Sequence, residues 1–217
     1  MTELAALYPF LEPAGRPDPA AVLADVTRST VEKVGEIGRL RTAVAEAVAE
    51  RLAACATAMA ERFAAGGRLY TFGNGGSSTD ATALATLFVA PGPGHRRLPA
   101  VSLTDDVATL TALANDVGFE VGFARQIAAA ARPGDVALGL STSGGSANVL
   151  RGFSAARERG LLTVGLAGYS GGPMAEAAAR GEIEHLFVMP SASVHRIQEA
   201  QTTTYHVLWE LVQQALA

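Results

Sequence analysis

Two hydrophobic patterns divide the chain near residue 66. From Pro19 to about Ala65 apolar residues recur at spacings of one or two helical turns, which predicts two helices. The second helix has an amphipathic face that packs on its own domain or forms an oligomer contact, and the pattern leaves both readings open. That face carries Leu40, Val44, Val48, Leu52, Met59 and Phe63.

After Gly66 and Gly67 the pattern changes to short apolar runs that alternate with helical segments. The runs are RLYTF, LPAVSL, DVALGLS, LLTVGLAG and IEHLFVMP, and a closing helix is expected over 194–217. Alternating strands and helices predict an α/β fold with a doubly wound, five-stranded parallel sheet. We therefore expect an N-terminal helical segment, 1–66, and one structural unit, 67–217. Ligands of such sheets bind beyond the carboxyl ends of the strands.

Composition narrows the possible partners. The 217 residues carry a formal charge of −4 and no dense basic block, which argues against direct nucleic-acid binding. The single lysine, Lys33, leaves the predicted sheet without a Schiff-base or P-loop lysine. The single cysteine, Cys55, rules out an intrachain disulfide. The opening MTELAALYPFLEP lacks the features of a signal peptide, and no apolar stretch reaches about 20 residues, so we expect a cytoplasmic protein without a membrane span.

Two loops after predicted strands have the composition of anion-binding sites. The first strand runs into Gly73-Asn74-Gly75-Gly76-Ser77-Ser78, whose flexible backbone can direct N–H groups at an anion where a helix begins. The third strand ends in Ser141-Thr142-Ser143-Gly144-Gly145-Ser146, a dense uncharged set of hydroxyls with Ser146 as a natural N-cap. A tight turn with a cap accounts for part of each loop but not for the packed hydroxyls. A small phosphorylated ligand is the prediction.

A dinucleotide fold is the competing interpretation of the first loop. The loop reads G-x-G-x-x-S, and Asp105 and Asp106 follow the second strand, where a ribose-binding acid is expected. Ser78 stands at the third glycine position, and a nucleotide leaves the STSGGS loop unexplained.

Four motifs resemble, in order and spacing, the phosphoheptose isomerase group of SIS (sugar isomerase) domain proteins: GNGGSSTDA, ALANDVGF, STSGGSANVL and HRIQEAQTTTYHVLWELV. The resemblance covers nearly the whole chain. It implies a flavodoxin-like fold and a homotetramer that binds sedoheptulose 7-phosphate. The substrate-binding residues it implies are Asn74, Gly75, Gly76, Ser77, Asp116, Ser141, Thr142, Ser143 and Ser146.

The catalytic pattern of that family is matched only in part. Family members carry a His and a Glu one turn apart on the helix after the first loop, where this chain has Ala83 and Leu87. The last helix keeps the family's Gln198 and His206, whereas His195 replaces an aspartate. Gln198 and His206 are thus the only retained zinc ligands of the family. The sequence requires no cofactor, and a zinc site and the family's usual mechanism are both in doubt.

The last helix carries a polar stripe. At about 100° per residue, His195, Glu199 and His206 fall with Thr202 within an arc of about 60°, with Gln198 beside it. The stripe is either a solvated or interface-bonded face, or it faces the ligand with His206 as acid/base and His195 or Glu199 in place of the absent glutamate. The leading prediction is a phosphosugar-binding protein that isomerises sedoheptulose 7-phosphate or a related ketose phosphate with an altered catalytic set. The alternative, favoured by the missing glutamate, is a non-catalytic regulatory or adaptor protein that binds a sugar phosphate.

Overall fold

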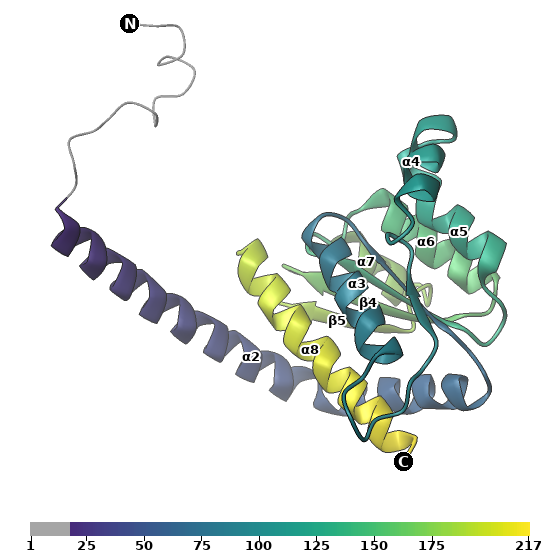
Figure 1. The fold of residues 1–217 in the computed structure, drawn as a ribbon, viewed down its shortest axis with the longest axis horizontal. Helices are drawn as coiled ribbons and strands as arrows, with labels where there is room; N and C mark the ends of the chain where they lie inside the picture. Colours follow the sequence, from purple (N-terminus) through teal and green to yellow (C-terminus); the bar gives the residue numbers. More distant parts are fainter. Residues whose placement is uncertain (1–17) are drawn as a thin grey trace, which may run out of the picture. The chain divides into compact units, whose positions relative to one another are not determined.

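The computed structural model describes residues 18–217 and shows an α/β fold (Figure 1). The chain forms two compact units, Met1–Gly38 and Arg39–Ala217, and the whole sheet belongs to the second. The division that the sequence predicts after residue 66 is of a different kind. It marks the place where the long helix has ended and the first strand is about to begin. In chain order the elements are α2 (Pro19–Ala64), β1 (Leu69–Gly73), α3 (Gly76–Val89), β2 (Ala100–Ser102), α4 (Val107–Asp116), η2 (Phe119–Val121), α5 (Gly122–Ala130), β3 (Val136–Ser141), α6 (Ala147–Glu158), β4 (Leu162–Gly168), α7 (Gly172–Ala179), β5 (His185–Met189) and α8 (Val194–Ala215).

The sheet confirms the predicted fold class. Its five strands are parallel and lie in the order β2-β1-β3-β4-β5. Every residue of β1, β3 and β4 is buried, as expected for strands covered on both faces, which explains why their sequences read as continuous apolar runs. The chain moves outward from β1 to β2 and then returns to β3 on the other side of β1.

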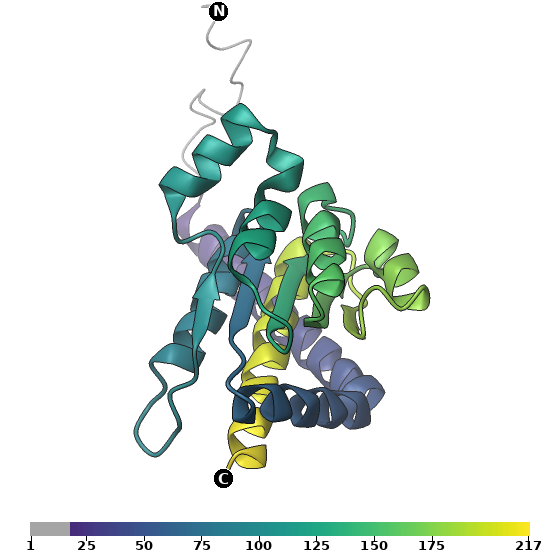
Figure 2. The ribbon, with the colours of Figure 1, turned by 90° about the vertical axis from the view of Figure 1, so that its right-hand side faces the viewer.

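Helices cover both faces of this sheet (Figure 2). Helices α5, α6 and α7 pack side by side on one face, and α3 and α8 pack together on the other. The part of α2 that belongs to this unit packs along the second pair. The ring of Phe63 on α2 stacks on that of Phe88 on α3 with centroids 5.4 Å apart. Arg51 of α2 donates to the carbonyl oxygen of Leu186 on β5.

An aromatic cluster holds α5 and α6 on the sheet. The ring of Phe72 on β1 lies 5.4 Å from the ring of Phe123 and 5.3 Å from that of Phe153, measured between centroids. Gly139 on β3 makes room for it, because a Cβ there would approach the Phe153 ring to 2.6 Å. Any larger residue at this position would displace the rings and, with them, the middle of α6, which carries Phe153.

Residues 19–64 form one helix of 46 residues, so the prediction of two helices was wrong. Gly35 and Gly38 are the glycines inside this range, and glycine lowers helix stability without ending a helix as proline does. Of the helices in the described part of the chain, none is both long and apolar enough to cross a bilayer.

Two glutamines of α8 offer a test of how buried amides are tolerated. Gln201 is fully buried, and neither its amide nitrogen nor its oxygen has a partner among the described residues. Gln213 is nearly as buried, but its amide accepts from the Arg96 N–H at 2.9 Å and donates to the Arg96 carbonyl at 3.0 Å. An unpaired buried polar group costs stability, whereas a paired one contributes to it.

We therefore expect Gln201→Met to stabilise the protein by about 1 kcal/mol, a rise in Tm of about 2–4 °C. The matched variant Gln213→Met should lower Tm. Thermal unfolding followed by circular dichroism measures both. Destabilisation by Gln201→Met would mean that an ordered water or another group satisfies this amide.

Candidate functional site

The candidate site lies where the order of the strands reverses. The register pairs Gly73 at the end of β1 with Leu140 near the end of β3, so the loops that follow these strands leave the sheet side by side. Parallel sheets bind ligands at this kind of crevice. The two loops with anion-binding composition, 73–78 and 141–146, are thus brought together as the sequence predicted.

The first loop turns sharply into α3. Gly75 has φ +55°, and the first α3 turn begins with the Ser77 N–H donating to the Asn74 carbonyl oxygen at 3.0 Å. A Cβ on Gly76 would lie 2.1 Å from Nε2 of Gln198, so only glycine lets this amide approach the loop as it does. The amide of Gln198 on α8 therefore lies against the surface of the first loop. The side chain of Ser77, in the same loop, is buried.

The second loop collects hydroxyl groups. The Ser141 hydroxyl lies 3.0 Å from that of Ser146 and 3.4 Å from that of Ser143, and the Ser143 hydroxyl accepts from the Gly145 N–H at 3.2 Å. Ser146 stands at the N-cap of α6, as the sequence predicts, but its side chain makes no capping hydrogen bond. Its hydroxyl faces Ser141 instead, which leaves the first N–H groups of α6 open toward the loop.

The loop after β4 braces the second loop from behind. A Cβ on Gly144 would lie 1.9 Å from the Gly171 carbonyl oxygen, and one on Gly172 would lie 2.6 Å from the Ser143 carbonyl oxygen. The Met174 N–H also donates to the Gly144 carbonyl at 2.9 Å. Backbone packs directly on backbone here. The cradle formed by the second loop, 141–146, therefore has a fixed shape.

A reciprocal amide pair joins the two loops. The side chain of Asn74 donates to Asn148 at 2.8 Å and accepts from it at 2.9 Å. Asn148 lies in the first turn of α6 and is 3% exposed. Asn74 is among the residues that the family resemblance implies bind the substrate, whereas Asn148 was not predicted. A polar residue on the inner side of a helix that follows a hydroxyl-rich loop was a usable signal for it.

One residue of the polar stripe on α8, Thr202, contacts Asp80 of α3 together with the neighbouring Tyr205. The Thr202 hydroxyl donates to Oδ1 of Asp80 at 3.3 Å, and the Tyr205 hydroxyl lies 3.5 Å from the same atom. Oδ2 of Asp80 is buried and has no partner among the described residues. Burial raises the pKa of the Asp80 carboxyl above its usual value, and hydrogen bonds from Thr202, Gln198 and Tyr205 offset only part of that rise.

His206 is exposed and has a defined tautomer. Its Nδ1 lies 2.8 Å from the Thr202 carbonyl oxygen, and its ring stacks on Tyr205 with centroids 4.9 Å apart. A carbonyl oxygen can only accept, so the neutral imidazole carries its proton on Nδ1. Nε2 then presents a lone pair that can take a proton from a ligand.

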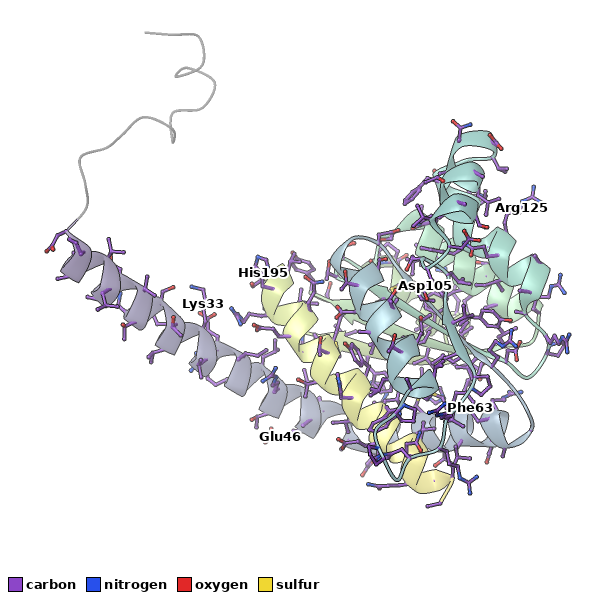
Figure 3. The ribbon with its side chains drawn as sticks, viewed as in Figure 1. Lys33, Glu46, Phe63, Asp105, Arg125 and His195 are labelled. Carbon is purple, nitrogen blue, oxygen red and sulfur yellow. The ribbon has the colours of Figure 1, made fainter. Side chains whose placement is uncertain are left out.

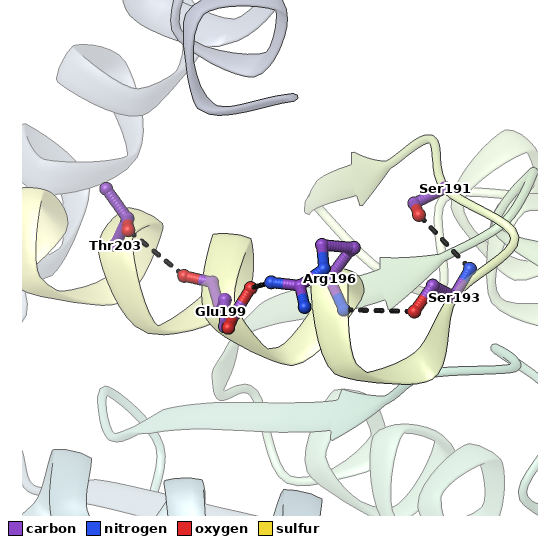
Figure 4. A network of polar contacts seen from close by, with 5 residues as sticks. All are labelled: Ser191, Ser193, Arg196, Glu199 and Thr203. Atoms are coloured by element: carbon purple, nitrogen blue, oxygen red, sulfur yellow. Dashed lines mark hydrogen bonds and ion pairs between the residues drawn. The ribbon is translucent and has the colours of Figure 1, made fainter. Parts of the chain in front are cut away.

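The two proposed substitutes for the family's glutamate have different surroundings. His195 is exposed in the first turn of α8 (Figure 3). Glu199 forms an ion pair with Arg196, whose backbone N–H is capped by the Ser193 hydroxyl (Figure 4). This ion pair holds the Glu199 carboxylate against a residue of its own helix, whereas His206 makes no ion pair with another described residue.

Asp116 and the two remaining histidines have other surroundings. Asp116, the last residue of α4, is exposed, and its carboxylate accepts from the neighbouring Asn115 amide at 2.7 Å. His185 opens β5 and its pKa is lowered by burial, in line with a structural role. The ring of His95 lies against that of Trp209, tilted by 42° with centroids 4.7 Å apart. No contact places any of these side chains against the hydroxyl-rich loop within residues 18–217.

The two α3 side chains that the family resemblance aligns with a His and a Glu are Ala83, which is exposed, and Leu87, which is partly buried. Neither side chain can bind a metal. Over the described residues there is no group of three or more His, Cys, Asp or Glu that could hold a metal ion.

Comparison with known proteins decides the family. Residues 34–168 match the SIS domain model, well over half of the chain. This protein belongs to the SIS domain family. A phosphoheptose isomerase of Aquifex aeolicus is 41% identical over 189 residues, with 85% of this chain and 96% of that protein covered. A phosphoheptose isomerase of Geobacter sulfurreducens is 43% identical over 170 residues, with 78% and 87% covered.

Solved structures agree with this SIS assignment. The phosphoheptose isomerase of Neisseria gonorrhoeae superimposes with a TM-score of 0.80 at 32% identity, covering 87% of this chain and 99% of that one. A phosphoheptose isomerase of Francisella tularensis gives a TM-score of 0.81 at 28% identity, with 87% and 98% covered. The likeness therefore extends over almost the full length of both enzymes.

The amide pair generates a stability prediction. Truncating one amide leaves the other buried and unpaired, so Asn148→Ala should cost about 1–3 kcal/mol, and the double variant with Asn74→Ala should cost less than the sum of the two single variants. Urea unfolding of the four proteins of this double-mutant cycle measures the coupling energy. A coupling near zero would show that the pair does not hold the two loops together.

Asp80 generates a pH prediction. Because its folded-state pKa is raised, the ionised carboxyl lowers stability above that pKa, and the penalty disappears as pH falls below the unfolded value of about 3.9. Asp80→Asn should therefore have a higher Tm than the wild type at pH 7, and the difference should shrink toward pH 4. Asp106→Asn is the control, since its exposed carboxyl has a pKa lowered by its hydrogen bond with Thr109 and should show the opposite sign.

Proposed function

We propose that this SIS protein isomerises sedoheptulose 7-phosphate, or a related ketose phosphate, between its ketose and aldose forms. The observation that carries the proposal is the hydroxyl-lined loop at the reversal of strand order, with an exposed imidazole on the neighbouring helix. The phosphoheptose isomerases to which the chain is similar support the same reaction class.

The phosphate would bind at the second loop. Ser143 is exposed and Thr142 partly exposed on this loop, and the N–H groups at the start of α6 add the positive end of a helix. This arrangement holds a dianion without a lysine. The first loop, with Asn74 fixed by Asn148, would bound the sugar on the other side.

His206 would move the proton. Nε2 takes the proton from the hydroxyl-bearing carbon next to the ketose carbonyl, and the C–H electron pair forms the carbon–carbon double bond of an enediolate while the charge moves to the carbonyl oxygen. The amide of Gln198 can donate to that oxygen. Return of the proton to the former carbonyl carbon, together with transfer of the hydroxyl proton, gives the aldose.

A second candidate is a protein that binds the sugar phosphate without converting it. The aliphatic side chains of Ala83 and Leu87 favour this alternative, because they remove an acid/base pair from α3. Assembly into a homotetramer and a cytoplasmic location, both expected from the sequence, stay predictions.

The test is turnover of sedoheptulose 7-phosphate by the wild type and by His206→Gln, which can hydrogen-bond but cannot shuttle a proton. We expect kcat to fall by at least about 100-fold in the variant with substrate affinity within about threefold, since only proton transfer is removed. Val207→Ala, next to it on α8, is the control. Equal turnover by His206→Gln would remove this residue from the mechanism.

A double variant, Ala83→His with Leu87→Glu, separates the two functions. If the wild type binds the sugar phosphate without turnover while the double variant turns it over, the protein is a binding protein that lost its chemistry. If the wild type turns over, α8 supplies the proton transfer. The same assay run with and without added zinc tests whether a metal contributes to either activity.

A further inference from the structure

Tyr169 has a backbone conformation that its side chain disfavours. It follows β4 directly with φ +51°, and every other residue with positive φ in the range 18–217 is a glycine. In this left-handed region the Cβ of an L-residue crowds the following carbonyl oxygen, so the conformation costs free energy that glycine would avoid. Such strain concentrates at ligand sites, where a side chain is kept for function.

Tyr169 stands beside the hydroxyl-rich loop. The register pairs Ser141 with Ala167, two residues before Tyr169. A Cβ on Gly168 would lie 2.5 Å from both the Thr142 carbonyl oxygen and the Ile197 side chain of α8. The backbone just before Tyr169 is thus in close contact with the start of the second loop on one side and with the first turn of α8 on the other.

The side chain is not used by the fold. Tyr169 is 42% exposed. Its hydroxyl makes no hydrogen bond to another residue of the described chain, and its ring forms no pair with another described aromatic ring. Neither packing nor hydrogen bonding therefore explains why a strained position carries a tyrosine.

The cradle offers polar groups to a ligand but no apolar face, and a tyrosine ring supplies such a face. Hydroxyls and backbone N–H groups bind the phosphate and the sugar hydroxyls, but they leave the C–H face of the carbon chain uncovered. An aromatic ring offers a rigid apolar face of the right kind at little cost in side-chain entropy.

We propose that Tyr169 is a specificity-determining residue whose ring packs on the carbon chain of the bound sugar phosphate, at the rim of the phosphate cradle. This inference rests on the proposed function. It assigns to the loop after β4 a direct role in ligand binding in addition to bracing the second loop.

The experiment is isothermal titration of sedoheptulose 7-phosphate and of inorganic phosphate into the wild type, Tyr169→Phe, Tyr169→Gly and Tyr169→Asn. The ring is kept in Phe and lost in Gly and Asn, both of which tolerate positive φ. We expect Tyr169→Phe to match the wild type and the other two to bind the sugar phosphate about tenfold more weakly. Affinity for inorganic phosphate should not change. Ser170→Ala, in the same turn, is the control.

Thermal unfolding without ligand separates a ligand role from a structural one. Tyr169→Gly and Tyr169→Asn should melt at or above the wild-type temperature, because the strain is relieved and little packing is lost. A lower Tm, unchanged sugar-phosphate affinity, or a Tyr169→Phe variant as weak as Tyr169→Gly would each overturn the assignment. If the wild type itself does not bind the sugar phosphate, the proposed function is overturned and this assignment with it.

Discussion

The parallel pairing of β1 with β3 is the constraint on which the site depends. These strands are adjacent in the sheet although β2 lies between them in the chain, and their register places the loops 73–78 and 141–146 side by side. Packing fixes that register, since a slip of one residue would bring a larger side chain to the place of Gly139, where a Cβ would lie 2.6 Å from the Phe153 ring. The Asn74–Asn148 pair then ties the two loops together beyond the ends of the strands.

Much of the fold could be read from the sequence. The five apolar runs fall on the five strands, and Gly75 and Gly144 have the positive φ that a tight strand-to-helix turn needs. Local pattern carries this information because strand burial and turn conformation act on neighbouring residues. The prediction of two N-terminal helices was wrong, because residues 19–64 form one helix. Glycines inside a helix lower its stability without marking its end.

The site was predictable only in part, because its decisive contacts join distant segments. Asn148 finds its partner 74 residues away, and Asp80 meets α8 across 122 residues, so neither contact leaves a local signal. Serine at position 146 was predicted to cap α6, yet its hydroxyl turns to Ser141. The left-handed conformation of Tyr169 is also invisible in the sequence, because tyrosine is a residue that this conformation normally excludes.

The interlocked glycines of the second loop and of the turn after β4 limit how this protein can evolve. Gly144, Gly171 and Gly172 leave no room for a side chain, so mutations at these positions deform the second loop. Change can therefore act more easily on the surrounding positions of α3 and α8, and on Tyr169 and Ser170 in the turn after β4. A loop core that tolerates almost no change, surrounded by positions that do, lets one scaffold keep its shape while its chemistry is lost or rebuilt.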